Sequence, residues 1–134
     1  MLYNVTTGYG GVKKVPNANI VLLVSSVHEV EKRGIPFCFT SGHAYPAYAD
    51  YYNSTADLDQ IDWALLQRRD FSLDANDPGK KDRYQAEALV HHHLPLEGLL
   101  GMACYDEEVK KWIESELQAR SIEMKVLALP RYYF

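Results

Sequence analysis

The chain has 134 residues, of which 47% are apolar and 24% charged, and its 18 acidic and 14 basic side chains leave a net charge of −4. This length predicts one globular domain whose core is large enough to fold without a disulfide or a structural metal. The charge excludes the strongly basic surface of a general nucleic-acid-binding protein, but not a local basic site.

Membrane-spanning and secreted proteins are also disfavoured. The longest aliphatic run, Ile20 to Val24, is far shorter than the ~20 residues that a membrane helix needs. The residues Met1 to Asn4 do not begin a signal peptide, because no basic region followed by an apolar one is present. We therefore expect a cytoplasmic protein in which Cys38 and Cys104 are reduced thiols.

The first half of the chain predicts short elements separated by turn residues. They are a turn at 7–11, a buried strand at 20–25, a helix at 27–33 ended by Gly34 and Pro36, a strand at 36–40, a helical stretch at 44–52 and a helical turn at 58–66. Four tyrosines of this stretch, Tyr45, Tyr48, Tyr51 and Tyr52, favour half-buried core residues, with stacking on nucleic-acid bases as the alternative.

The second half begins with a loop at 71–81 and then shows clearer patterns. Strands are predicted at 84–91 and 99–105, joined by a turn at 95–98, and a last strand at 124–129. Asp106 is a typical N-cap for a helix with four apolar residues on one face, namely Val109, Trp112, Ile113 and Leu117. Runs of strands with a few helices indicate an α+β fold that is mostly antiparallel.

One candidate site lies on the predicted strand at 84–91. Gln85 and Glu87 alternate along it and would share a face, where a carboxylate beside an amide can bind a sugar hydroxyl and accept a proton. An exposed glutamate on an edge strand is the alternative. His91 and His93 would share this face, so a metal site with Glu87 can be drawn, although a solvated histidine run explains the same residues.

A second candidate is the stretch from Arg68 to Arg83, which carries five basic side chains among four aspartates. It is the one stretch whose local charge suits a phosphate backbone, and a solvated loop of mixed charge is the alternative.

In combination, several segments resemble the DarT family of DNA ADP-ribosyltransferases, toxins of bacterial toxin–antitoxin pairs. They follow in order along the chain: Phe39 to Ala44 (FTSGHA), Leu58 to Trp63 (LDQIDW), Tyr84 to Val90 (YQAEALV) with Pro95, and Tyr133 with Phe134. The resemblance implies that residues 1–134 form a single ADP-ribosyltransferase-like domain, the C-terminal two-thirds of the family's domain. Its fold would be α+β, with a split antiparallel sheet, flanking helices and NAD in the cleft.

The resemblance also implies a reaction: transfer of ADP-ribose from the co-substrate NAD to thymidine bases of single-stranded DNA, without a metal. Glu87 matches the catalytic glutamate, which would hold the nicotinamide ribose as the glycosidic bond breaks and help to remove the thymine ring proton. The other implied site residues are His43 in the active-site cleft, Gln85 on NAD, and Lys80, Lys81 and Arg83 on DNA. The implied protein partner is an antitoxin of the macrodomain type, and no membrane is involved.

The start of the chain departs from the family pattern. Family members usually carry Arg-x-Pro immediately before Met-Leu-Tyr, whereas Met1 to Tyr3 come first here. We therefore expect the N-terminal part of the family fold, which binds much of the NAD, to be missing. The alternative function is a non-catalytic truncated remnant that binds nucleic acid or an antitoxin partner.

Overall fold

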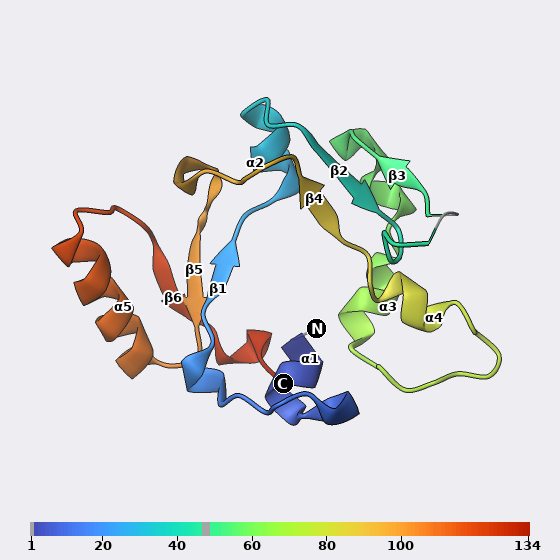
Figure 1. Cartoon of the computed structure of the whole chain (residues 1–134), viewed down its shortest axis with the longest axis horizontal. Helices are drawn as coiled ribbons and strands as arrows, with labels where there is room; N and C mark the ends of the chain where they lie inside the picture. Colours follow the sequence, from blue (N-terminus) through green and yellow to red (C-terminus); the bar gives the residue numbers. More distant parts are fainter. Residues whose placement is uncertain (1, 47–48) are drawn as a thin grey trace. The chain divides into compact units, whose positions relative to one another are not determined.

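A computed structural model describes residues 2–46 and 49–134. The chain divides into two compact units (Figure 1): unit 1 is Met1–Ser26 with Leu96–Phe134, and unit 2 is Val27–Pro95. None of the described helices combines the length and the apolar character that a membrane crossing requires.

Unit 1 is built on a three-stranded sheet in the order β1-β5-β6. The strands are β1 (Leu22–Val24), β5 (Gly101–Cys104) and β6 (Val126–Ala128). β1 pairs antiparallel with β5, and β5 pairs parallel with β6. The parallel pair is possible because the chain crosses over between the two strands through the long helix α5 (Glu107–Ala119).

Helix α5 begins where the sequence predicts it, because the Asp106 carboxylate accepts a hydrogen bond from the Val109 amide at 2.9 Å. Its buried residues Ile113 and Leu117 pack in a core with Cys104 and Val126. Trp112, expected on the same face, is instead 61% exposed. At 3.6 residues per turn it points roughly 100° away from Ile113, beyond the edge of the buried stripe.

The ends of the chain complete unit 1. An unpredicted helix α1 (Leu2–Thr7) begins the described chain, and short 3₁₀ helices follow at η1 (Tyr9–Gly11), η2 (Asn17–Asn19), η4 (Leu96–Gly98) and η5 (Pro130–Tyr132). The buried Tyr133 hydroxyl contacts the carbonyl oxygens of Ile20 at 2.8 Å and Ala103 at 3.1 Å, which fixes the C-terminal segment to the sheet. Both cysteines are free thiols.

Unit 2 contains a second three-stranded sheet in the order β3-β2-β4, which is entirely antiparallel. The central strand is β2 (Phe37–Thr40), flanked by β3 (Tyr51–Tyr52) and β4 (Ala88–Val90). The helices are α2 (Val27–Lys32), η3 (Thr55–Gln60), α3 (Trp63–Arg68) and α4 (Lys80–Arg83). Short helices with two small sheets make an α+β fold, as the sequence predicts.

The tyrosine segment does not form the expected helix. Tyr51 and Tyr52 form strand β3, and the Tyr52 ring stacks on Phe39 of β2 at a centroid distance of 5.3 Å. Pairing with the central strand therefore overrides the helical spacing of the tyrosines. Tyr45 is 90% exposed rather than half-buried, and Tyr48 lies outside the described residues.

The strand predicted at 84–91 is shorter than expected. Helix α4 continues to Arg83, Tyr84 and Gln85 form a turn, and β4 begins only at Ala88. The alternation that would place Gln85 and Glu87 on one strand face therefore does not apply. The two strands joined by the turn at 95–98 also belong to different sheets, because β4 pairs with β2 and β5 pairs with β1 and β6.

Candidate active site

Glu87 lies directly before β4, where the sheet of unit 2 holds its main chain. The Thr40 amide donates to the Glu87 carbonyl oxygen at 2.9 Å. The Glu87 side chain turns toward the loop after β2: its Oε1 accepts a hydrogen bond from the Ala44 amide at 3.0 Å and lies 3.5 Å from His43 Nδ1. Tertiary structure thus brings together the two residues that the sequence suggests as catalytic, and both side chains remain partly exposed, at 44% for His43 and 40% for Glu87.

The His43 ring has two competing partners at one nitrogen. Its Nδ1 accepts a hydrogen bond from the Tyr45 amide at 3.2 Å, which uses the lone pair of a neutral imidazole. Nδ1 can donate to Glu87 only when it carries a proton, and it then gives up the bond from Tyr45. The Ala44 amide is therefore the donor that holds Glu87 in either state. Oε2 of Glu87 makes no hydrogen bond with a described residue and is available to a ligand.

The loop Ser41–Ala44, called the His43 loop below, is held from several sides. Thr40 is wholly buried, and its hydroxyl donates to the Gly42 carbonyl oxygen at 2.6 Å. Asp82 Oδ1 accepts a hydrogen bond from the His43 amide at 3.4 Å. The Tyr51 hydroxyl donates to the Ala44 carbonyl oxygen. These contacts fix the amide that binds Glu87, and the sequence did not indicate that Thr40, Asp82 or Tyr51 would hold this loop.

Two of the three basic residues expected to contact DNA are held by aspartates. Lys80 is buried, with its Nζ 2.7 Å from Asp70 Oδ2, and hydrogen bonds from Lys80 and Ser72 hold the pKa of the Asp70 carboxyl far below its ordinary value. This ion pair fastens the start of α4 to the loop before it. A contact between Lys80 and DNA remains a prediction. In the structure, the Lys80 ammonium group is already paired with Asp70.

Arg83 is held in the same way at the other end of α4. Its guanidinium binds both carboxylate oxygens of Asp77, at 3.1 and 2.6 Å, and Asp62 at 3.1 Å, and it lowers the pKa of the Asp77 carboxyl. Lys81, by contrast, is exposed and forms no ion pair with a described residue. Of the three basic residues, Lys81 is therefore the one with a charge available to a phosphate.

Gln85 is exposed and stays close to α4, because its Nε2 donates to the Lys81 carbonyl oxygen at 3.1 Å. Its described hydrogen bond therefore does not involve Glu87.

The histidine run gives no support to a metal site. The His91 and His92 rings lie 3.8 Å apart and both residues are exposed. Among residues 2–46 and 49–134, no group of three or more histidine, cysteine, aspartate or glutamate side chains is placed to hold a metal ion.

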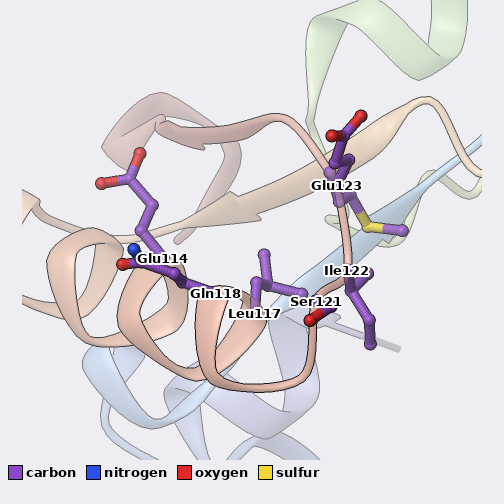
Figure 2. Close-up of a pocket in the computed structure, with 7 residues that line it drawn as sticks. Glu114, Leu117, Gln118, Ser121, Ile122 and Glu123 are labelled. Carbon is purple, nitrogen blue, oxygen red and sulfur yellow. The ribbon is translucent and has the colours of Figure 1, made fainter.

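Two surface hollows lie in unit 1, and neither is lined by Glu87 or His43. The first, of about 380 Å³, lies at the end of α5, where Glu114, Leu117 and Gln118 come from the helix and residues 121–124 from the segment after it (Figure 2). The second, of about 590 Å³, is lined by Thr6, residues 14–18, Tyr105 and Phe134. The candidate active site is therefore defined by the geometry at Glu87 and not by these hollows.

The sequence matches the family described as "ssDNA thymidine ADP-ribosyltransferase, DarT" over residues 1–134. It is 47% identical over 134 residues to a DNA ADP-ribosyl transferase of Escherichia coli O127:H6, a match that covers 100% of this chain and 62% of that relative. The chain thus spans less than two thirds of the length of this curated relative.

Solved structures give the same result. The fold is similar to Thermus sp. 2.9 DarT in complex with NAD⁺, with a TM-score of 0.83 and 25% identity over 99% of this chain and 66% of that one. It is also similar to the same protein in complex with ADP-ribosylated single-stranded DNA, with a TM-score of 0.82, 25% identity and coverage of 99% and 63%. The expected fold class is confirmed.

Proposed function

Because this chain belongs to the DarT family, we propose that it transfers ADP-ribose from NAD to thymidine bases of single-stranded DNA. The Thermus relative has been seen with NAD⁺ and with ADP-ribosylated single-stranded DNA, which supports both substrates. The observation that carries the proposal in this chain is Glu87, with one oxygen held by the Ala44 amide and the other available to a ligand.

The reaction replaces one bond at the anomeric carbon of the nicotinamide ribose with another. The bond from this carbon to nicotinamide breaks, the electron pair leaves with nicotinamide, and positive charge develops on the ribose. A ring nitrogen of thymine then forms the new bond and loses its proton. A carboxylate beside the ribose stabilises the developing charge, and it can also accept the proton, so Glu87 is proposed for both roles.

His43 and Gln85 complete the proposed substrate contacts. His43 is partly exposed beside Glu87, and an imidazole at this position can bind a substrate oxygen or take up a proton. Gln85 keeps its amide oxygen for NAD, since its described hydrogen bond uses Nε2. Both roles rest on the resemblance to the family and on proximity to Glu87.

For DNA, we propose that Lys81 contacts a phosphate and that Tyr45 stacks on a base. The Tyr45 ring is 90% exposed and lies 6.3 Å from the His43 ring between centroids. An aromatic side chain that contributes so little to the core, beside the candidate catalytic residues, suits a single-stranded substrate whose bases are unpaired. Lys80 and Arg83 would affect DNA binding chiefly through the conformation of the loop before α4, which their ion pairs with Asp70 and Asp77 hold in place.

The proposed setting is the bacterial cytoplasm, where NAD and single-stranded DNA are both present. The proposed protein partner is an antitoxin of the macrodomain type, as the family resemblance implies.

The test is to incubate the protein with NAD and a thymidine-containing single-stranded oligonucleotide and to measure the mass of the DNA. We expect a gain of one ADP-ribose, and Glu87→Gln should lower the rate by roughly 10²- to 10⁴-fold, because an amide neither neutralises the ribose charge nor accepts a proton. Glu97→Gln, at an exposed glutamate of unit 1, is the matched control and should retain activity.

Two results would contradict the proposal. An oligonucleotide without thymidine that is modified equally well would show that the base is wrong. Oligonucleotide binding without any NAD consumption would instead support the alternative, a non-catalytic remnant that binds nucleic acid.

A further inference from the structure

We propose that Asp82 is a positioning residue for the candidate active site. Its carboxylate holds the His43 loop in the conformation that places the Ala44 amide on Glu87 and the His43 ring beside it. This inference deepens the proposed function and rests on it for the part that concerns catalysis. The structural part, the contact between Asp82 and the loop, can be tested without activity.

The first observation is the close approach of Asp82 to Gly42. A Cβ atom on Gly42 would lie 2.2 Å from Asp82 Oδ2, a distance that real Cβ contacts essentially never show, and 3.0 Å from its Cγ, which is tighter than most real contacts. The φ angle of Gly42 lies outside the left-handed region, so the backbone conformation does not by itself require glycine. The carboxylate of Asp82 occupies the space that a side chain at position 42 would take, so an alanine here would displace this carboxylate from the loop.

The second observation is the hydrogen bond from the His43 amide to Asp82 Oδ1 at 3.4 Å. One residue further along the same loop, the Ala44 amide donates to Glu87 at 3.0 Å. Neighbouring peptide groups of one short loop are thus bound to two carboxylates, of which Glu87 is the proposed catalytic group. A shift of the loop away from Asp82 would move the donor on which Glu87 depends.

The third observation is the position of Asp82 within α4. Its neighbours Lys80 and Arg83 are bound to Asp70, Asp77 and Asp62, so the helix that carries Asp82 is itself anchored. Asp82 is therefore the side chain through which the anchored helix acts on the His43 loop.

The loop keeps other contacts when Asp82 is removed. Thr40 still binds the Gly42 carbonyl oxygen and Tyr51 the Ala44 carbonyl oxygen. We therefore expect Asp82→Ala to fold and to bind NAD with a KM within about threefold of the parent, while kcat falls roughly 10- to 100-fold because the reacting groups are misplaced. Asp82→Asn keeps an oxygen of the same size in the same place and should recover most of this loss.

A double-mutant cycle tests the contact directly. Gly42→Ala should be as harmful as Asp82→Ala, because its methyl group collides with the carboxylate. In Gly42→Ala/Asp82→Ala the collision is absent, so the double variant should be no worse than Asp82→Ala alone. Asp59→Ala, at an exposed aspartate of unit 2, is the control and should combine additively with Gly42→Ala.

The same double-mutant cycle is measured with two observables: kcat, and the free energy of unfolding from urea denaturation. Additive effects in both measurements would overturn the proposal. Non-additive unfolding energies in a protein that shows no transfer to DNA would confirm the contact but remove its catalytic role, and the proposed function would then fail separately. Equal loss of kcat in Asp82→Asn and Asp82→Ala would also contradict the role assigned to the oxygen atom.

Discussion

The buried hydroxyl group of Thr40 supports the candidate active site. A polar group without a partner would be costly at this fully buried position, but the Thr40 hydroxyl donates to the Gly42 carbonyl oxygen and lies 3.4 Å from the Glu87 amide, which donates to it. One side chain therefore satisfies both the His43 loop and the segment that carries Glu87. A valine would fill the same volume but leave both groups unpaired.

Tyr45 offers a prediction at the scale of one residue. If its exposed ring stacks on a base, Tyr45→Ala should weaken single-stranded DNA binding by roughly 5- to 150-fold, equivalent to ~1–3 kcal/mol. Tyr45→Phe should bind like the parent, since stacking needs the ring and not the hydroxyl. Fluorescence anisotropy with a labelled oligonucleotide measures both, with Tyr132→Ala in unit 1 as the control. Parental affinity in Tyr45→Ala would exclude the stacking role.

Candidate site residues could be proposed from the sequence where they belong to a motif. Glu87 and His43 stand in segments that resemble a family, and the structure places them 3.5 Å apart. The role proposed for Asp82 was not predictable, because its carboxylate contacts Gly42, which lies 40 residues earlier in the chain. Its neighbours along the sequence predict only a charged stretch.

Among the elements, the segment from Asp70 to Arg83 is the one whose conformation depends most on ion pairs. Its ends are joined by the pairs Lys80–Asp70 and Arg83–Asp77, and the Tyr84 hydroxyl donates to the Leu65 carbonyl oxygen and accepts from the Asp70 amide. The long loop between α3 and α4 is therefore closed by side chains at its base. This arrangement explains how a segment without regular pairing takes a defined form.

The acid dependence of this loop is predicted from its carboxyl groups. The pKa values of Asp70 and Asp77 are lower in the folded chain than the ~3.9 of an aspartate in the unfolded chain. At pH values between the folded and the unfolded pKa, the unfolded state therefore binds more protons than the folded state. Their contribution to stability is complete above about pH 5 and is lost as the pH falls below about 4. Asp70→Asn should therefore be less stable than the parent at pH 7, and this difference should shrink in acid.

Urea denaturation between pH 3 and pH 7 measures the effect. The control is Asp50→Asn, at an exposed aspartate that forms no ion pair with a described residue. A difference between Asp70→Asn and the parent that stays constant across this range would refute the assigned ion pair.

Elements with a strong local signal were predicted well, and those that depend on pairing were not. Asp106 and the apolar spacing after it specify α5 locally. The segment 84–91 has an alternating pattern over its whole length, yet only Ala88 to Val90 forms a strand with β2, because helix α4 and the turn after it continue to Gln85. The start of this strand is therefore set by the helix before it.

For the whole molecule, the net charge of −4 limits how DNA can be held. With Lys80 and Arg83 bound to aspartates, few positive charges near the candidate site are available to phosphates. We therefore expect binding of single-stranded DNA to depend only weakly on salt, with a large share of the affinity from base contacts.

Lys81 provides the test. Each phosphate contact to a single strand contributes a slope of about −0.7 to log K against log salt, so Lys81→Ala should make the slope shallower by about 0.7. Lys80→Met should leave the slope unchanged, because its ammonium already binds Asp70. Titrations at several salt concentrations measure this, with Lys125→Ala in unit 1 as the control. An unchanged slope in Lys81→Ala would place the phosphate contact elsewhere.

The sequence by itself determined the α+β class, the start of α5 and the family, and it proposed Glu87 and His43 as site residues, because each of these inferences depends on residues close together in the chain. Only the tertiary structure decided which strands pair, that Tyr45 is exposed, that Lys80 and Arg83 are bound to aspartates, and that Asp82 contacts the His43 loop. These features depend on partners far apart in the sequence, and a side chain's local pattern does not specify which distant group neutralises or covers it.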